Sequence, residues 1–218
     1  MLRVTIFRFQ KFIVFIINFE AMKRTGFVVV SIIIIALWSF KSNAQAEKHL
    51  TGSVINWMTF EEAVEKSKTE RRKIFIDVFT EWCGWCKVMD KNTFPDAEIA
   101  KLLNEKFYAV KLDAEQANDV VFRGTTFKYV STGNRGYHQL AAALLNNQMS
   151  YPNFVFLDEE FRIIPIYQGM TSLPGYKKPE EFYPFLSFVG TDSYQKMNIS
   201  DYQKEYKSPY STTSSVKN

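Results

Sequence analysis

Residues 73–87, KIFIDVFTEWCGWCK, are the stretch that decides the fold. The first half, Lys73–Phe79, is almost wholly apolar and rich in β-branched and aromatic residues, which is typical of a strand buried on both faces. A C-x-x-C pair, Cys83 and Cys86, follows directly, and apolar residues at helical spacing come after it. The stretch therefore predicts a buried strand that turns into a helix at the first cysteine.

The chemistry of this stretch rests on Cys83 and Cys86, which are the only cysteines in the chain and so form no disulfide framework. A structural zinc site needs about four ligands, and His49 and His138 are the only histidines. We therefore expect no metal and no cofactor. At a helix start, the backbone amides favour the thiolate of Cys83, with Cys86 one turn deeper as the shielded partner. Such a pair can attack a disulfide and then resolve the mixed disulfide.

The rest of the central region alternates helices and strands. Thr59 and Glu62 form a capping-box pattern at the start of a helix that we expect to reach about residue 70. Asp96 resembles the cap of another helix, and Pro179 lies where prolines begin helices. Further strands are expected at Phe107–Asp113, Asn153–Leu157 and 162–167.

An additional segment lies between residues 114 and 150. Residues 120–130 predict two short strands with Gly124 at the bend, and residues 137–146 predict a short helix. His138 is interpreted as a surface or cap residue rather than a catalyst. From residue 191 the chain is polar and lacks periodicity, so we expect a flexible tail over residues 191–218.

The N-terminus has the order of an export signal over residues 1–46. Lys23 and Arg24 precede an apolar stretch of about 12 residues, shorter than the roughly 20 that span a bilayer. Small residues before Glu47 suit cleavage. An uncleaved anchor is the alternative to cleavage. Met22 is interpreted as the true start, and a long genuine signal that begins at Met1 is the alternative. We expect export, to the periplasm first, with secretion or anchoring as alternatives and no other membrane contact.

The formal charge of +4 comes from the N-terminus. The first 46 residues contain six Lys and Arg residues and one Glu, which leaves 21 basic and 22 acidic residues elsewhere. A body with that balance has no basic surface of the kind that binds nucleic acid. We expect no nucleic-acid partner.

The sequence FIDVFTEWCGWCK resembles the active-site strand and turn of thioredoxin-like proteins, most closely exported bacterial members with a C-G-W-C centre. Further matches follow in the family's order. Asp77 lies six residues before Cys83, where the family has a buried acid, and Lys111 in AVKLD matches the lysine that pairs with it. Tyr151 and Pro152 match the family's cis-proline loop.

The resemblance implies an α/β fold of three layers: a central mixed sheet flanked by helices, with the hairpin and helix inserted before the cis-proline loop. That domain would occupy residues 47–190. It also implies a monomeric enzyme that reduces or isomerises disulfides in protein substrates and exchanges electrons with a donor or acceptor protein. Cys83, Cys86, Asp77 and Lys111 would be catalytic. The substrate contacts would be Trp82, Gly84, Trp85, Tyr151 and Pro152.

Two departures keep alternatives open. Trp85 stands where thioredoxin has a proline, and the central residues of the motif tune the redox potential, so a net oxidant is one alternative. The inserted segment lies near the side where substrates bind. A module that holds client polypeptides without turnover is the second alternative, although the presence of Asp77 with both cysteines favours an enzyme.

Overall fold

The computed structural model describes residues 54–133 and 135–210. The predicted export signal lies outside the described residues. A five-stranded sheet has the order β1-β3-β2-β8-β9. Its strands are β1 (Trp57–Met58), β2 (Lys73–Phe79), β3 (Phe107–Asp113), β8 (Asn153–Leu157) and β9 (Leu173–Pro174).

The sheet is mixed, and its two central strands carry the acid and the lysine singled out from the sequence. Strand β2 pairs with β3 in parallel and with β8 antiparallel. The parallel register sets Asp77 directly beside Lys111. Nearly every residue of β2 is buried, as its apolar sequence predicts.

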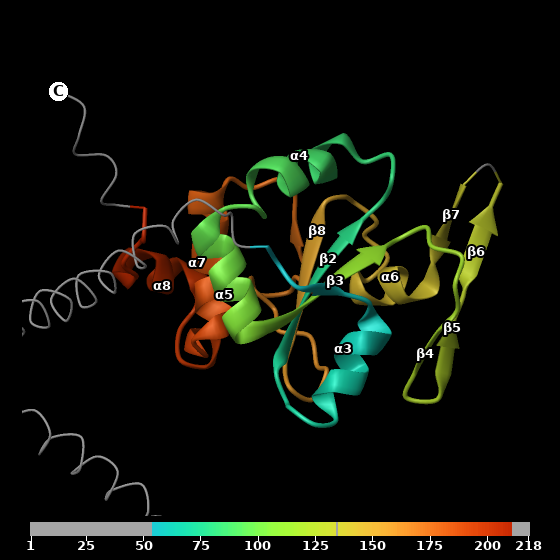
Figure 1. Cartoon of the computed structure of the whole chain (residues 1–218), viewed down its shortest axis with the longest axis horizontal. Helices are drawn as coiled ribbons and strands as arrows, with labels where there is room; N and C mark the ends of the chain where they lie inside the picture. Colours follow the sequence, from blue (N-terminus) through green and yellow to red (C-terminus); the bar gives the residue numbers. More distant parts are fainter. Residues whose placement is uncertain (1–53, 134, 211–218) are drawn as a thin grey trace, which may run out of the picture. The chain divides into compact units, whose positions relative to one another are not determined.

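Helices cover both faces of the sheet (Figure 1). On one face α5 (Ala97–Lys106) and α7 (Pro179–Gly190) enclose an aromatic core that includes Phe75, Phe154 and Phe182. On the other face α3 (Phe60–Ser67) and α6 (Gln139–Leu144) pack on aliphatic residues of β2, β3 and β8. Helix α4 (Gly84–Asn92) lies across one end of the sheet. The predicted three-layer α/β fold is confirmed.

Side-chain caps fix two of the helix starts. Thr59 and Glu62 form the predicted capping box of α3. The Asp96 carboxylate accepts hydrogen bonds from the amides of Glu98 and Ile99 at the start of α5.

Among residues 54–133 and 135–210, no helix combines the length and the hydrophobicity that crossing a membrane requires.

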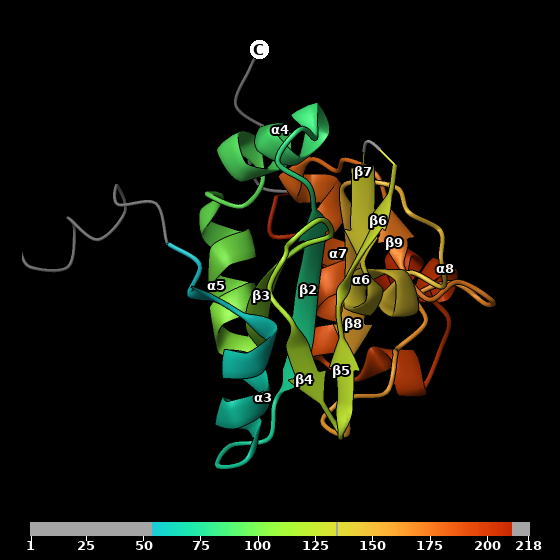
Figure 2. The ribbon, with the colours of Figure 1, turned by 90° about the vertical axis from the view of Figure 1, so that its right-hand side faces the viewer.

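The inserted segment differs from the prediction. It contains two hairpins, β4–β5 and β6–β7, rather than one. Tyr137 pairs with Val130 in the second hairpin, so the helix begins only at Gln139. The first hairpin corresponds to the two strands predicted at residues 120–130, whereas the strands of the second carry too little hydrophobic alternation to be recognised from sequence. Figure 2 shows the hairpins as one ribbon in front of α6. The strands are β4 (Val120–Phe122), β5 (Thr125–Phe127), β6 (Tyr129–Thr132) and β7 (Arg135–His138).

The strand predicted at residues 162–167 is wrong. Only a single bridge joins Leu157 and Ile163, and Pro165 has no amide hydrogen with which to continue a ladder. The edge of the sheet is formed instead by β9, which pairs with Asn153 and Phe154.

The prediction of a loose tail from residue 191 is also wrong up to residue 210. A short turn, η2 (Ser193–Gln195), leads into helix α8 (Ile199–Glu205). Ile199 is buried, and Tyr202 packs on Phe188 of α7 with its hydroxyl 2.7 Å from the Ser187 hydroxyl. Few apolar residues pack this helix against the domain, so its polar sequence shows no helical periodicity from which it could be predicted.

Candidate active site

Cys83 and Cys86 are joined by a disulfide at the start of α4, with their Cα atoms 5.3 Å apart. Cys83 is the N-cap of the helix, and its Sγ accepts a hydrogen bond from the amide of Cys86 at 3.1 Å. This sulfur is therefore placed where helix amides stabilise negative charge. The exposed fractions are 4% for Cys83 and 2% for Cys86, so the disulfide form does not show the predicted difference in shielding.

A tight turn brings strand β2 into this helix. The Cys83 amide donates to the carbonyl of Thr80 at 3.0 Å, which closes the turn through Glu81 and Trp82. A Cβ atom on Gly84 would meet no atom within 4 Å. Packing therefore does not explain the glycine, and its contact with substrate stays a prediction.

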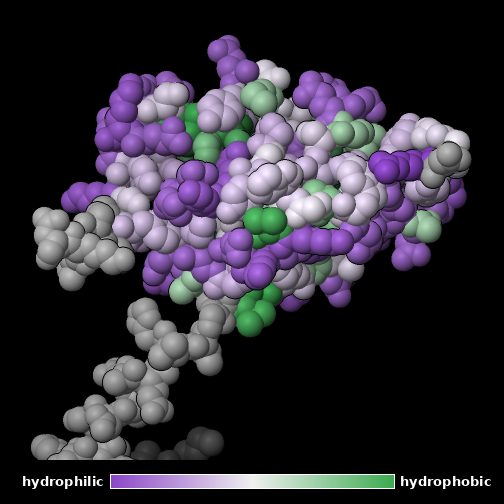
Figure 3. Space-filling model, turned by 90° about the horizontal axis from the view of Figure 1, so that it is seen from above, coloured by the Kyte–Doolittle hydropathy of each residue, from purple (hydrophilic) through white to green (hydrophobic). Residues whose placement is uncertain are grey.

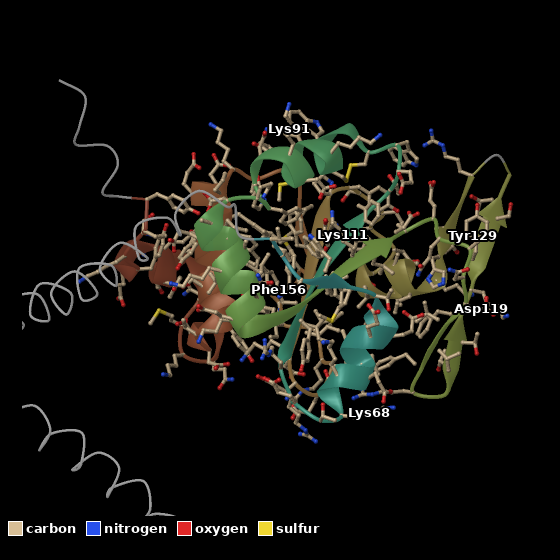
Figure 4. The ribbon with its side chains drawn as sticks, in the orientation of Figure 1. Lys68, Lys91, Lys111, Asp119, Tyr129 and Phe156 are labelled. Carbon is tan, nitrogen blue, oxygen red and sulfur yellow. A yellow bond between two sulfur atoms is a disulfide. The ribbon has the colours of Figure 1, made fainter. Side chains whose placement is uncertain are left out.

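Asp77 and Lys111 form a buried ion pair. The Lys111 Nζ lies 2.7 Å from Oδ2 of Asp77, whose side chain is only 1% exposed. The other Asp77 oxygen, Oδ1, has no hydrogen-bond partner among the described residues. Lys111 lies in the interior of the fold below α4, whereas Lys91 projects from the outside of that helix (Figure 4). The predicted pairing is confirmed; the catalytic role stays a prediction.

Burial governs the protonation of Asp77. Burial raises the pKa of its carboxyl to about 6, against the opposing effect of the Lys111 ammonium, and the negative charge of Asp90 adds to the rise. The same carboxylates outweigh burial at Lys111 and raise the pKa of its ammonium, which stays charged. A carboxyl with a pKa raised in this way binds a proton more readily than an exposed aspartate does, a property that suits a general base.

The peptide bond between Tyr151 and Pro152 is cis, as predicted. The loop directly precedes β8, whose first residue Asn153 pairs with Val78 of β2. Burial, followed by the charges of Glu115 and Asp113, raises the pKa of the Tyr151 phenol to about 12. Tyr151 is thus a neutral side chain at physiological pH.

Trp82 lies half exposed beside the cysteines and is held by the inserted segment. Its Nε1 donates to Oε1 of Glu115 at 3.0 Å, and the guanidinium of Arg135 lies 4.7 Å from its ring centroid. Its ring also meets that of Tyr151 edge-on at 5.9 Å. Sequence reasoning missed Glu115 and Arg135, because no local motif marks residues that meet Trp82 only through the fold.

Trp85 occupies the other flank of the motif. Its side chain is 60% exposed and stacks on Tyr176 at 5.3 Å. On the face that carries α4, hydrophobic residues form small separate patches among hydrophilic ones (Figure 3). Trp82 and Trp85 are therefore two exposed aromatic side chains on either side of the motif, and each contacts a tyrosine ring.

His138 takes no part in this arrangement. It is fully buried, and its Nδ1 accepts from the amide of Leu140 as the N-cap of α6, while Nε2 lies 3.1 Å from the Asn118 carbonyl. The cap interpretation is confirmed, and the surface one is wrong. Within the described ranges, no three His, Cys, Asp or Glu residues gather in a group that could hold a metal ion.

A C-x-x-C disulfide at a helix start, a buried Asp–Lys pair and a cis-proline on a mixed sheet together define a thioredoxin-like protein. Residues 41–174, more than half of the chain, match the family Thioredox_DsbH, described as "Protein of unknown function, DUF255". The chain belongs to this family.

Curated relatives match over shorter stretches. Spermatogenesis-associated protein 20 of Mus musculus is 34% identical over 84 residues, which is 38% of this chain and 11% of that protein. The thiol:disulfide interchange protein DsbD of Pseudoalteromonas atlantica is 27% identical over 71 residues, or 32% of this chain and 12% of that protein. The aligned part of the chain thus spans about an eighth or less of the length of these relatives.

Solved structures are similar at low identity. One titled "DsbH Oxidoreductase" is 19% identical with a TM-score of 0.46, covering 71% of this chain and 94% of that one. A thioredoxin from Thermus thermophilus is 20% identical with a TM-score of 0.42, covering 63% and 87%.

Proposed function

We propose that this protein is an exported thiol–disulfide oxidoreductase that reduces or isomerises disulfides in protein substrates. The observation that carries the proposal is the position of Cys83, whose sulfur caps α4 and accepts the Cys86 amide. That position stabilises a thiolate, which is the reactive form in disulfide exchange. Membership of the thioredoxin-like family supports the same chemistry.

The reaction has two exchange steps. In the reduced protein the Cys83 thiolate attacks one sulfur of the substrate disulfide, which forms a mixed disulfide and releases the other sulfur as a thiolate. Cys86 then loses its proton to Asp77 and attacks Cys83, which releases the second substrate thiol and forms the Cys83–Cys86 disulfide. A dithiol protein partner must return two electrons and two protons before the next cycle.

Substrate recognition involves the groups around the disulfide. Trp82 and Trp85 offer exposed aromatic surface on either side of it. Tyr151 and the cis Pro152 contribute the loop that precedes β8. The two contacts of the inserted segment with Trp82 support a role for that segment in choosing the substrate.

The proposal is tested by alkylating the reduced protein with iodoacetamide between pH 5 and pH 8. The account expects Cys83 to react far faster than a free cysteine at pH 6, and the fast phase to vanish in Cys83→Ser but not in Cys86→Ser. A Cys83 no more reactive than free cysteine would support the client-holding module instead. The redox potential sets the direction: a value well above the roughly −200 mV region indicates an oxidant.

Export has its own test. N-terminal sequencing of the protein recovered from its native host should begin near Gln45 or Glu47. Recovery of the intact chain from the cytosol would refute export and leave the chemistry untouched.

A further inference from the structure

Asp90 contacts the outer side of Lys111. The Lys111 Nζ forms ion pairs with Oδ2 of Asp77 and with Oδ1 of Asp90. The exposed fractions of the side chains rise from 1% at Asp77 through 22% at Lys111 to 47% at Asp90. Lys111 thus bridges a buried carboxylate and one that reaches solvent.

Asp90 also shares a helix face with the deeper cysteine. It lies four residues after Cys86 on α4, and residues at that spacing are neighbours on a helix. The contact with Lys111 therefore joins the last turn of α4 to strand β3.

We propose that Asp90 is a positioning residue that holds Lys111 between two carboxylates and so limits how strongly the lysine stabilises the ionised form of Asp77. The inference rests on the proposed function, because it concerns the base that serves Cys86. A lysine bound to one buried carboxylate alone would hold that group ionised. Sharing the ammonium with Asp90 weakens this effect.

The surroundings leave few other groups to act on Asp77. The rings of Trp57, Phe79 and Phe94 each lie 5.0 Å from the Lys111 Nζ, and they stabilise a cation without accepting a proton. The charges that bear on Asp77 are Lys111 from β3 and Asp90 from α4. In the disulfide form, Lys111 and Asp90 are therefore the two charged side chains through which a substitution can tune this carboxyl. In the reduced protein the thiol of Cys86, whose proton Asp77 is proposed to accept, is a further titratable group.

Solvent reaches the lysine from the Asp90 side. A pocket of about 400 Å³ is lined by Asp90 and Lys111 together with Trp57, Phe94 and Pro95. Water in this pocket can exchange protons with the outer end of the bridge. Two charged side chains, Lys111 and Asp90, thus lie between the buried Asp77 and solvent.

The experiment is a carboxyl-carbon NMR titration of Asp77 in the full chain, with the Asp77 signal assigned by its absence in Asp77→Asn. In Asp90→Asn the titration midpoint should fall by roughly half a pH unit or more, since Lys111 then serves Asp77 alone. Asp90→Glu, which keeps the charge, should stay near the wild-type midpoint. Glu105→Gln on α5 removes one exposed carboxylate elsewhere and should change nothing.

The kinetic readout is the pH at which resolution of the mixed disulfide reaches half its maximal rate, which should fall with the Asp77 midpoint. An unchanged midpoint in Asp90→Asn overturns the inference, and so does an equal change in Glu105→Gln. Asp90→Ser gives a second neutral variant should the asparagine variant not fold. A wild-type protein that titrates as expected but turns over no disulfide refutes the proposed function and leaves the role of Asp90 in the titration standing.

Discussion

Asp77 and Lys111 are register partners on adjacent parallel strands, and the 2.7 Å contact between Oδ2 and Nζ joins an almost fully buried carboxyl to a partly exposed lysine. One carboxyl oxygen contacts the lysine, and the other has no partner among the described residues. A charged carboxylate in this position is only partly compensated. Its ionisation therefore links protein stability to pH and, under the proposed mechanism, links the rate of the second exchange step to pH as well.

The first prediction concerns stability. Burial raises the pKa of Asp77 to about 6, so the folded protein binds this proton more tightly than the unfolded chain does. The stability that the folded protein gains from this proton is fully present below about pH 4, and it is lost as the pH rises through about 6. Asp77→Asn cannot ionise, so its free energy of unfolding relative to wild type should rise by about 2–3 kcal/mol between pH 4 and pH 7.

Urea unfolding at a series of pH values measures this difference. Asp119→Asn, at an exposed surface ion pair, is the control, and its difference from wild type should stay nearly constant over the same range. A flat difference for Asp77→Asn would show that Asp77 is not the titrating group.

The second prediction separates the two exchange steps. Asp77→Asn should slow release of product from the mixed disulfide near neutral pH, because it removes the base for Cys86, while alkylation of Cys83 changes little. Stopped-flow turnover with a disulfide substrate measures the release of product, and iodoacetamide kinetics on the reduced protein measure the alkylation of Cys83. If both rates fall together, Asp77 acts on Cys83 as well; if neither falls, it is structural.

The third prediction assigns the cysteines. Cys86→Ala should accumulate covalent complexes with client proteins, since nothing resolves the mixed disulfide, and Cys83→Ala should not. Nonreducing gels followed by mass spectrometry detect the complexes. Complexes that form with Cys83→Ala instead would reverse the roles of the two residues.

The fourth prediction concerns the inserted segment. Arg135→Ala removes the guanidinium from the Trp82 ring, a contact worth about 0.5–1 kcal/mol, and should raise KM for a peptide disulfide about two- to fivefold. The neutral bis(2-hydroxyethyl) disulfide is too small to reach the surface that Arg135 and Trp82 form, so the rate at which the protein reduces it should not change. Arg123→Ala in the other hairpin is the matched control, because Arg123 contacts Phe122 and Phe161 rather than Trp82. Equal losses with both disulfides would assign Arg135 a general structural role.

The fifth prediction tests the C-terminal helix. Ile199→Ala should lower the free energy of unfolding by about 2 kcal/mol, since it empties a buried site against α7. Ser200→Ala, the exposed neighbour, should have little effect. Matching stabilities of the two variants would mean that α8 does not belong to the folded domain.

The sequence predicted those features in which local pattern and buried position coincide. The apolar run of β2 and the capping residues Thr59 and Asp96 each act within a few residues, and the structure contains them where expected. The pair of Asp77 with Lys111 and the cis Pro152 followed from resemblance, because the family's motif order carries their long-range relation.

Features that depend on packing alone could not be predicted. Asp90 and Lys111 belong to different elements, and nothing near either residue marks their contact. Arg135 meets Trp82 only because the β6–β7 hairpin rises toward the end of the domain that carries α4 (Figures 1 and 2). Helix α8 depends on Ile199 and on the packing of Tyr202 against Phe188 of α7, and two such residues are too few to predict a helix in a polar sequence.

Disulfide exchange between the Cys83–Cys86 pair and other proteins is measured by turnover of a protein substrate. Reduced full-length protein is mixed with a disulfide-bonded protein substrate at pH 7, and substrate thiols and the Cys83–Cys86 disulfide are quantified over time. The account predicts one substrate disulfide broken for each Cys83–Cys86 disulfide formed, at a rate far above that of an equal concentration of dithiothreitol. A rate no greater than that of the free dithiol, or substrate reduction that persists in Cys83→Ser, would contradict it.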